Sequence, residues 1–451
     1  MKKGLWLILV ILSVFAYKSG FAGSEPSGET LKKYVAKQDA SYGYFVKRIV
    51  DRETFSYAEI ILTSQTWKNI VWKHQMYIIK PKTAENNVRH ALMLIDGGQW
   101  NRSYERTDTN AMAAKYDQKF EMLATLANHA KTPVVVLRHV PHQALWGMKE
   151  DALIAYTFDK YIQTGDSEWP LLLPMVKSAT RAIDAAQDFS RNQWSLSLET
   201  FTVTGSSKRG WATWLTGAVD KRVTAIAPMV IDILNMKAQM EHQKAVLGDY
   251  SEQISEYTSF SLQARLETPS GKTLQNMVDP YSYREDITQP KLIILGTNDR
   301  YWTLDALNLY WKELAGLKYI LYMPNEGHGL RNYKKVMGSI NALHQHAAFG
   351  TPLPKLDWEH KISKGKISFT IKSGIAPNRV RAWTAYAPTK NFHGAQWESQ
   401  SVRTKKSGYV YRTEIPQDKC LAVFLEMEYE SLTLPYYFST NVLIAGPPHC
   451  M

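Results

Sequence analysis

Cysteine is scarce in this chain. Its 451 residues include two cysteines, Cys420 and Cys450, both near the C-terminus. No cysteine or histidine cluster has the spacing of zinc ligands and no nucleic-acid motif is present, so the sequence predicts no metal, no organic cofactor and no nucleic-acid partner. A disulfide between Cys420 and Cys450 would fix the C-terminal end of an exported protein, whereas two free thiols are the alternative that the sequence leaves open.

Long hydrophobic runs are also lacking, apart from one at the N-terminus. Leu5 to Ala16 is apolar, Lys2 and Lys3 precede it, and Gly20-Phe21-Ala22 places small residues at the −3 and −1 positions of a cleavage site. This pattern predicts a signal peptide over residues 1–22, and hence a periplasmic or secreted protein with no stable membrane insertion after cleavage. An uncleaved membrane anchor is the alternative.

Neither sign of charge forms a long block. Charged residues make up 21% and apolar residues 45% of the chain, which excludes wholesale disorder. The formal net charge is +12, and removal of Lys2, Lys3 and Lys18 with the signal peptide, which has no acidic residue, lowers it by three to +9. Because the basic residues are dispersed, we expect a solvated basic surface; contact with an anionic cell-envelope surface, such as lipopolysaccharide or anionic lipid, is the alternative.

Apolar segments typical of buried strands alternate with segments of helical periodicity. This order predicts an α/β fold, a mostly parallel sheet flanked by helices. The expected core strands are Ala91–Ile95, Pro133–Leu137, Phe201–Thr204, Val223–Met229, Lys291–Leu295 and Tyr319–Tyr322, with Ile60–Thr63 and Gln75–Ile79 as an early pair. The expected helices are Asp151–Tyr161, Leu171–Ala186, Thr213–Val219, Asp305–Leu314 and Tyr333–Ala348.

Two changes of pattern divide the chain. Residues 232–280 are polar, helical in pattern and inserted between two strands, where a cap over a site would lie. Beyond Pro354, short alternating segments predict an all-β, sandwich-like domain: Ile367–Ile371, Val380–Thr384, Tyr409–Thr413, Leu421–Glu428 and Tyr437–Ile444. The expected organisation is a signal peptide (1–22), an α/β domain (23–353) with a helical cap, and a C-terminal β domain (354–451).

The segment Gly205-Ser206-Ser207-Lys208-Arg209-Gly210 connects a predicted strand to a predicted helix. A serine at such a turn is typical of the nucleophile elbow of α/β hydrolases. Ser207 would be the nucleophile, and the backbone N–H of Lys208 would donate to the oxyanion. The usual G-x-S-x-G pattern has glycine where Arg209 stands here, with Gly210 one residue later; a serine-rich turn without chemistry is the alternative.

A serine nucleophile needs a base and a carboxylate that orients it. Asp299 and His328 each lie in a loop directly after a predicted strand, and the order serine, aspartate, histidine is that of α/β hydrolases. His328 is therefore predicted as the general base and Asp299 as its orienting group. Asp305 and Glu326 are rival acids.

Gly97 and Gly98 follow another core strand and are predicted to supply further backbone donors to the oxyanion, although a simple tight turn is the alternative. The side chains of Lys208 and Arg209 would either attract an anionic substrate or pair with carboxylates on neighbouring helices.

Other histidines and tryptophans carry weaker signals. His74, His139 and His142 are predicted to be structural, and His344 and His346 to be surface residues. Five tryptophans indicate an aromatic-lined pocket, with core packing as the default role of most: Trp67, Trp72, Trp100, Trp211 and Trp214.

The sequence resembles the PhoPQ-activated pathogenicity-related family, which includes autocrine proliferation repressor-like proteins. The most specific block is Gly205–Trp211 (GSSKRGW) with its continuation to Val223. Further blocks are Ser64–Trp67, Trp72–His74, Glu150–Tyr156, Asp279–Tyr281, Gly296–Asp299 and Pro324–Asn325 with His328. Residues 389–393 (TKNFH) depart from the more charged run that the family commonly has there.

The resemblance covers nearly all of the mature sequence. It implies an α/β-hydrolase fold with a C-terminal β domain, export, and Ser207, Asp299 and His328 as a triad. It also implies a link to virulence, to resistance to cationic peptides or to growth control, but no defined reaction. The serine motif is similar to that of glucuronoyl esterases, in which a basic residue also follows the nucleophile and the glycine is likewise displaced.

Two hypotheses about function follow. The first is an exported serine hydrolase that cleaves an ester or peptide bond in a small-molecule or peptide substrate. The second is a secreted binding or signalling protein on a hydrolase scaffold, without turnover and with the β domain as its contact surface.

Overall fold

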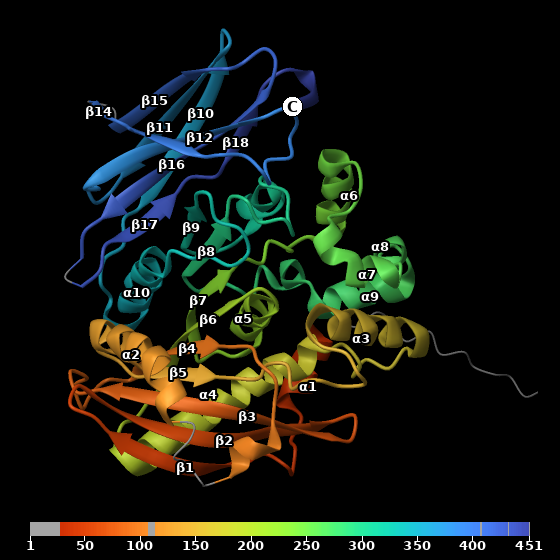
Figure 1. Cartoon of the computed structure of the whole chain (residues 1–451), viewed down its shortest axis with the longest axis vertical. Helices are drawn as coiled ribbons and strands as arrows, with labels where there is room; N and C mark the ends of the chain where they lie inside the picture. The colour runs from red at the N-terminus through yellow and green to blue at the C-terminus, as the bar shows by residue number, and fades with distance from the viewer. Residues whose placement is uncertain (1–27, 107–112, 406–407, 432, 451) are drawn as a thin grey trace, which may run out of the picture.

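The computed structural model describes residues 28–106, 113–405, 408–431 and 433–450 (Figure 1). The predicted signal peptide lies outside these residues. Among the described helices, none combines the length and the apolar character that a membrane span requires.

A long mixed sheet runs through the centre of the molecule. Its strand order in the described chain is β1-β2-β3-β5-β4-β6-β7-β8-β9-β17-β16-β12-β13. The first nine strands along the chain are β1 (Gly43–Asp51), β2 (Phe55–Trp67), β3 (Ile70–Pro81), β4 (His90–Ile95), β5 (Val134–Leu137), β6 (Thr200–Ser206), β7 (Val223–Met229), β8 (Lys291–Gly296) and β9 (Lys318–Met323). Strands β5, β4, β6, β7, β8 and β9 pair in parallel, and β2 pairs with β3 antiparallel. The predicted parallel core and early strand pair are confirmed.

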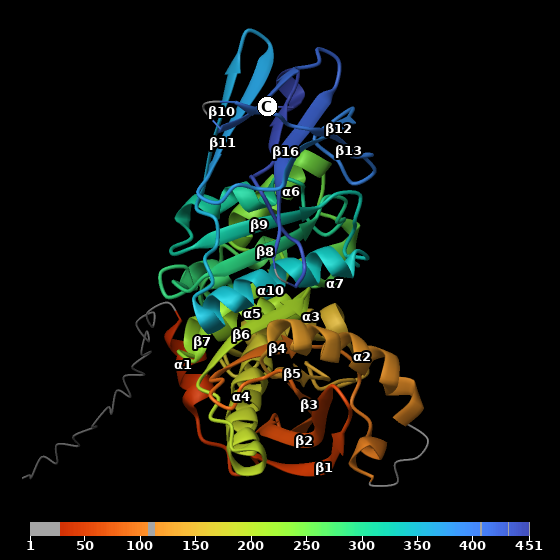
Figure 2. The same cartoon turned by 90° about the vertical axis from the view of Figure 1, so that its left-hand side faces the viewer.

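Helices cover both faces of this sheet, as apolar parallel strands require. On one face α2 (Ala113–Ala130) and α10 (Tyr333–Phe349) contact β3, β4, β5, β7 and β8. On the other, α1 (Glu29–Ala36) packs on α4 (Leu172–Trp194), and α4 and α5 (Lys208–Val219) lie against the strands (Figure 2). The buried side chains accordingly form one apolar cluster for each face.

The cap, residues 232–280, is helical, as its pattern indicates. It contains α6 (Met236–Leu247), η2 (Glu252–Ile254), α7 (Ser255–Ser259), α8 (Leu262–Arg265) and α9 (Pro269–Val278). The segment leaves the sheet after β7 and returns before β8, and it packs against α3 (Glu150–Thr164) on the right-hand side of Figure 1. An ion pair between Arg265 and Asp159 (2.7 Å) fastens the cap to α3.

The C-terminal strands form two layers. Strands β17 (Tyr436–Ser439), β16 (Cys420–Tyr429), β12 (Arg379–Ala387) and β13 (Glu398–Ser401) extend the long sheet, with β18 (Leu443–Ala445) beside β16. A second sheet contains β10 (Leu356–Ser363), β11 (Lys366–Ser373), β15 (Gly408–Glu414) and β14 (Thr404–Lys405). Their apolar faces share one core, which is the arrangement of a sandwich. The first of these layers, which contains β17, joins the α/β region because Ser439 on β17 pairs with Ile320 on β9.

Three local predictions differ from the structure. The predicted strand Tyr437–Ile444 is two strands, β17 and β18, and in the segment between them the Thr440 hydroxyl accepts from the Leu425 N–H (3.1 Å). The predicted helix Asp305–Leu314 is two 3-10 turns, η4 (Ala306–Leu309) and η5 (Trp311–Glu313). Lys318 Nζ donates to the carbonyls of Trp311 (2.6 Å) and Leu314 (2.8 Å) at the second turn.

The third difference concerns His344, which is not a surface residue. It is fully buried where α10 packs on the sheet, and its Nε2 lies 2.7 Å from Thr132 Oγ1. Burial strongly lowers the pKa of His344, with a further contribution from His90 beside it. His346, two residues later, is only partly buried.

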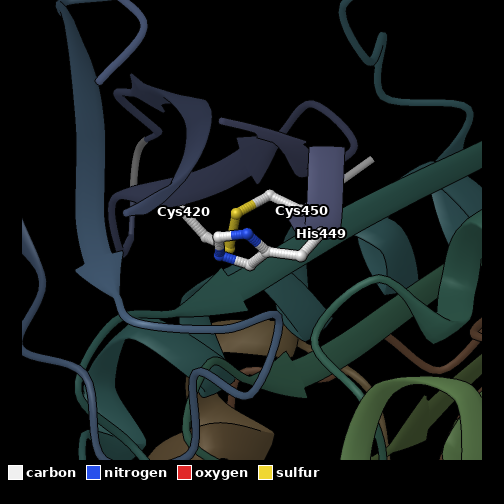
Figure 3. Close-up of side chains that lie close together, drawn as sticks. All are labelled: Cys420, His449 and Cys450. Carbon is white, nitrogen blue, oxygen red and sulfur yellow. A yellow bond between two sulfur atoms is a disulfide. The ribbon is translucent and has the colours of Figure 1, made fainter. Parts of the chain in front are cut away.

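Cys420 and Cys450 form a disulfide with a Cα–Cα distance of 5.5 Å, and it joins the start of β16 to the last described turn (Figure 3). His449 lies beside it, and the three ligand atoms are within 4.8 Å of one another. Since both sulfurs are bonded to each other, the group offers no thiolate to a metal.

We expect that replacing both cysteines by serine lowers the free energy of unfolding by about 3 kcal/mol, because the bond restricts a loop of 30 residues in the unfolded chain. Urea unfolding of the oxidised wild type and of the double variant measures the difference. Wild type treated with dithiothreitol is the control and should behave as the variant does; equal midpoints in all three samples would show that the bond has no stabilising role.

Candidate active site

Ser207 lies at the sharp turn between β6 and α5, with φ of 56° and ψ of −130°. Its N–H donates to Met229 O (2.8 Å) and its C=O accepts from the Trp211 N–H (2.9 Å), so the turn is held on both sides. A non-glycine residue at positive φ is sparsely populated and persists where the surrounding structure imposes it. The structure thus has the strand-turn-helix geometry of a nucleophile elbow.

Packing explains why the glycine of the serine motif stands at position 210 instead of 209. A Cβ on Gly210 would lie 2.9 Å from both Gly205 O and Met229 O, where no side chain fits. A Cβ on Gly205 would lie 2.7 Å from Arg209 O. The close approach of α5 to β6 and β7 therefore requires glycine at 205 and 210, while position 209 can carry a large side chain.

Ser207, His328 and Asp299 form one hydrogen-bonded chain. His328 Nε2 is 2.8 Å from Ser207 Oγ, and His328 Nδ1 is 2.8 Å from Asp299 Oδ2. Because a carboxylate can only accept, Nδ1–H donates to Asp299 and Nε2 is left to accept from the serine hydroxyl. The Tyr301 ring lies over the imidazole at a centroid distance of 4.3 Å, and the Tyr301 N–H donates to Asp299 Oδ1 (3.0 Å).

The rival acids have other partners. Asp305 Oδ1 lies 2.7 Å from His242 Nε2 on the cap, and Glu326 Oε2 accepts from the Arg331 N–H (2.8 Å). Burial tends to raise the pKa of Asp305, but the hydrogen bond and charge of His242 outweigh it and lower the pKa. Asp299 is thus the carboxylate that contacts His328.

The loops that carry Asp299 and His328 are fastened by the C-terminal domain. Asn298 Nδ2 donates to His393 O (3.1 Å) and to Ala395 O (2.7 Å). Asn325 Nδ2 donates to Trp397 O (3.0 Å), and its Oδ1 accepts from the Trp397 N–H (2.8 Å). The loop before β13, which includes the atypical 389–393 run, therefore supports both active-site loops.

The positive side chains after Ser207 pair with carboxylates, which is one of the two alternatives that the sequence leaves open. Arg209 Nη1 and Nη2 each donate to a different oxygen of Glu150 (2.7 Å), and Nε donates to Val140 O. Lys208 Nζ lies 2.9 Å from Glu150 Oε2 and 3.1 Å from Asp151 Oδ2. Burial would raise the pKa of Glu150, but the hydrogen bonds and charges of Arg209 and Lys208 hold that pKa at about 2.

The loop of Gly97 and Gly98 runs beside the elbow, because Ile95 at the end of β4 is paired with Gly205 on β6. A Cβ on Gly97 would lie 2.7 Å from Arg209 Nη2, and Gly98 has φ of 116°. Both glycines are thus required by packing or by backbone conformation. Their donation to an oxyanion stays a prediction.

A pocket with a cavity volume of about 60 Å³ adjoins the triad. Ser207, Lys208 and His328 line it together with Asp151. Its apolar lining consists of Trp211, Val230, Ile231, Ile233, Met236, Met240, Ile254 and Trp302. The cap supplies several of these side chains, and Tyr257 of the cap donates to Asp151 Oδ1 (2.9 Å) at the edge of the pocket.

The remaining histidines and tryptophans mostly pack. His74 is fully buried between Ser64 Oγ (3.0 Å) and Arg138 O (3.1 Å), and burial lowers its pKa to about 3. His139 and His142 bond Gln75 and Lys73. Of the five tryptophans that suggest an aromatic-lined pocket, Trp211 lines it. Core packing, the default for most of them, holds for Trp67, Trp72 and Trp214, and the Trp100 ring lies near the rings of His139 and His142.

The sequence alone assigns no role at the site to five further residues: Glu150, Asp151, Tyr257, Tyr301 and Trp302. Glu150 and Asp151 were visible as an acidic pair at the start of a predicted helix, and this was the available signal. Tyr301 and Trp302 lie two and three residues after Asp299, so their proximity to the site could have been inferred from that spacing.

The parallel sheet, the elbow and the Ser-His-Asp chain define an α/β-hydrolase fold. The chain belongs to the family described as PhoPQ-activated pathogenicity-related protein, whose model matches residues 31–393. It is also 30% identical over 459 aligned residues to autocrine proliferation repressor protein A of Dictyostelium discoideum, covering 94% of this chain and 89% of that protein.

Solved structures of esterases are more distant. Acetyl xylan esterase 1 from Thermoanaerobacterium sp. JW/SL YS485 shares 14% identity at a TM-score of 0.47, over 71% of this chain and 96% of the esterase. A glucuronoyl esterase from Solibacter usitatus shares 12% identity at a TM-score of 0.43, over 70% of this chain and 91% of that one.

We expect Arg209→Lys to lower the free energy of unfolding by about 1–3 kcal/mol, because lysine cannot form the two-pronged contact with Glu150. The loss should be smaller than for a fully buried pair, since the Glu150 side chain is 40% exposed. Denaturant unfolding measures it. Arg89→Lys, in an exposed pair with Glu199, is the matched control and should change little; equal losses would contradict the assignment.

Asp232 is a buried carboxyl that follows β7. Burial raises its pKa to about 7, against the hydrogen bond that Tyr310 OH donates to it (2.7 Å). Between about pH 4 and pH 7 the unfolded chain loses this proton first, so Asp232 lowers stability as pH rises through that window. Asp232→Asn should therefore raise the Tm at pH 8, with a gain that shrinks toward pH 4. Exposed Asp418→Asn is the control, and a gain independent of pH would refute this account.

Proposed function

We propose that this protein is a serine hydrolase that cleaves an ester or peptide bond. The observation that supports the proposal most directly is the continuous hydrogen-bonded chain from Ser207 through His328 to Asp299. In this mechanism Ser207 Oγ attacks the carbonyl carbon while His328 Nε2 takes the serine proton. His328 then gives the proton to the leaving group, and water hydrolyses the acyl-serine by the same route.

The oxyanion would be held by backbone donors. The Lys208 N–H is the first of α5, and the first N–H groups of a helix have no partner within the helix, so it is available to a developing negative charge. The loop of Gly97 and Gly98 would supply a second donor from the neighbouring strand end. Asp299 would keep His328 in the tautomer that the reaction needs and stabilise the imidazolium.

The place of action that we propose is outside the cytoplasm. The N-terminal segment has the pattern of a signal peptide, and a net charge of +9 on the remaining chain suits contact with anionic envelope surfaces. The family name and the name of the Dictyostelium relative associate such proteins with pathogenicity and with repression of proliferation. We propose that the hydrolase acts in a role of that kind, such as virulence or resistance to cationic peptides.

The test is covalent labelling of the purified protein with a fluorophosphonate probe, followed by mass spectrometry of the tagged peptide. We expect an adduct on Ser207 that is lost in His328→Ala and in Ser207→Ala. Turnover of activated esters should fall by about 10⁴-fold or more in Ser207→Ala and about 10⁴-fold in Asp299→Asn, which keeps the shape but not the tautomer.

Ser206→Ala is the matched control, because this neighbouring serine lies at the end of β6 and has no role in the proposed chain. It should label and turn over as the wild type does. Absence of an adduct from folded wild-type protein would instead favour the second hypothesis, a secreted binding or signalling protein without turnover.

A further inference from the structure

The pocket beside Ser207 has a wall that is mostly apolar. Trp211 comes from α5, Ile231 and Ile233 follow β7, and Met236 and Met240 come from the first helix of the cap. These side chains converge on the space that the serine hydroxyl faces. Such a wall stabilises apolar groups. Gln263 and Trp302 also line the pocket, and the buried Gln263 Oε1 and Trp302 Nε1 have no hydrogen-bond partner among the residues that the structure describes, so they suit a neutral polar atom of a substrate but supply no positive charge to pair with a carboxylate.

The cations nearest to the serine are already neutralised. Lys208 Nζ contacts Glu150 and Asp151, while Arg209 donates through Nη1 and Nη2 to the two oxygens of Glu150 and through Nε to Val140 O. Their side chains are 8% and 10% exposed, so an anionic substrate would have to displace a carboxylate to reach either one. The basic sequence after the nucleophile therefore builds the elbow and does not provide a binding site for a negative group.

The cap closes over this arrangement. Tyr257 of α7 donates to Asp151 Oδ1, on the same carboxylate that Lys208 Nζ contacts through Oδ2. Trp211 Nε1 donates to Val278 O at the end of α9, so the other end of the cap is also attached to α5. Helix α6 is attached separately, since Gln239 Nε2 donates to Ala306 O (3.1 Å) and His242 Nε2 lies 2.7 Å from Asp305 Oδ1, and its Met236 and Met240 side chains line the pocket beside Ser207.

Building on the serine hydrolase function above, we propose that the substrate presents an uncharged, apolar acyl group to Ser207 and that Met240 of the cap limits its length. The acyl part stays bonded to Ser207 through both halves of the reaction, whereas the alcohol or amine leaves after the first. The enclosed space beside the serine is therefore the space that must accommodate the acyl group.

The first experiment uses the mature full-length protein and two p-nitrophenyl esters of nearly equal shape, the 4-methylpentanoate and the hemisuccinate. In the hemisuccinate a carboxylate replaces the terminal isopropyl group of the 4-methylpentanoate. We expect kcat/KM to favour the neutral ester by about a hundredfold or more, because the wall leaves the carboxylate unpaired. Comparable values, or a preference for the hemisuccinate, would overturn the inference.

The second experiment compares Met240→Ala with Met122→Ala, an exposed methionine of α2 that does not line the pocket. Shortening Met240 should raise the octanoate-to-butanoate ratio of kcat/KM by about tenfold or more, while the control keeps the wild-type ratio. Equal ratios in the two variants would refute the role of Met240.

The two proposals fail in different ways. If Ser207 is labelled by the fluorophosphonate and esters are hydrolysed without discrimination between neutral and charged acyl groups, the acyl selection is wrong and the hydrolase function stands. If neither labelling nor turnover occurs in folded protein, the hydrolase function is wrong and the acyl selection is wrong with it. The wild-type comparison of the two esters does not depend on the folding of any variant.

Discussion

The hydrogen bonds from Asn298 and Asn325 to the backbone of residues 393–397 are the constraint on which the rest of the active site depends. Each asparagine is next to, or close to, a member of the triad, and each is bonded to the same C-terminal loop. The loops are also bonded to each other, since the Asn298 N–H donates to Glu326 O (2.9 Å) and the Asn325 N–H to Thr297 Oγ1 (3.0 Å). Asp299 and His328 are therefore placed by contacts from two parts of the chain.

The C-terminal β domain therefore contributes to the position of Asp299 and His328, besides any role of its own. A protein cut after Pro354 would lose residues 393–397 together with the strand that pairs with β9. Loss of activity in such a protein would not distinguish a separate role of the β domain from loss of support to the triad. Point changes on the outer strands are the better means of asking whether that domain binds a partner of its own.

Much of the fold, and the meeting of Ser207, His328 and Asp299 in one hydrogen-bonded chain, could be predicted, because each depends on local pattern. Ser207, Asp299 and His328 each follow an apolar strand of a parallel sheet, and the carboxyl ends of such strands meet at one edge. The acid that pairs with Lys208 and Arg209 could not be predicted in the same way, since Glu150 is far away in sequence and pairs only through tertiary packing. The prediction that His344 is a surface residue is wrong for a similar reason. Its polar side chain suggests exposure, but tertiary packing places it on the side of α10 that faces the sheet, where it is fully buried.

Strand β17, residues 436–439, lies on the side of β9 that faces away from β8 and pairs with it through Ser439 and Ile320. Before β17 docks, β9 presents unpaired N–H and C=O groups at the edge of the sheet. Such an edge is a template for association with other chains. A molecule in which β17 has not yet docked thus keeps an unpaired edge at β9. Substitutions that keep β17 from docking on β9 would therefore expose this edge and favour association between chains.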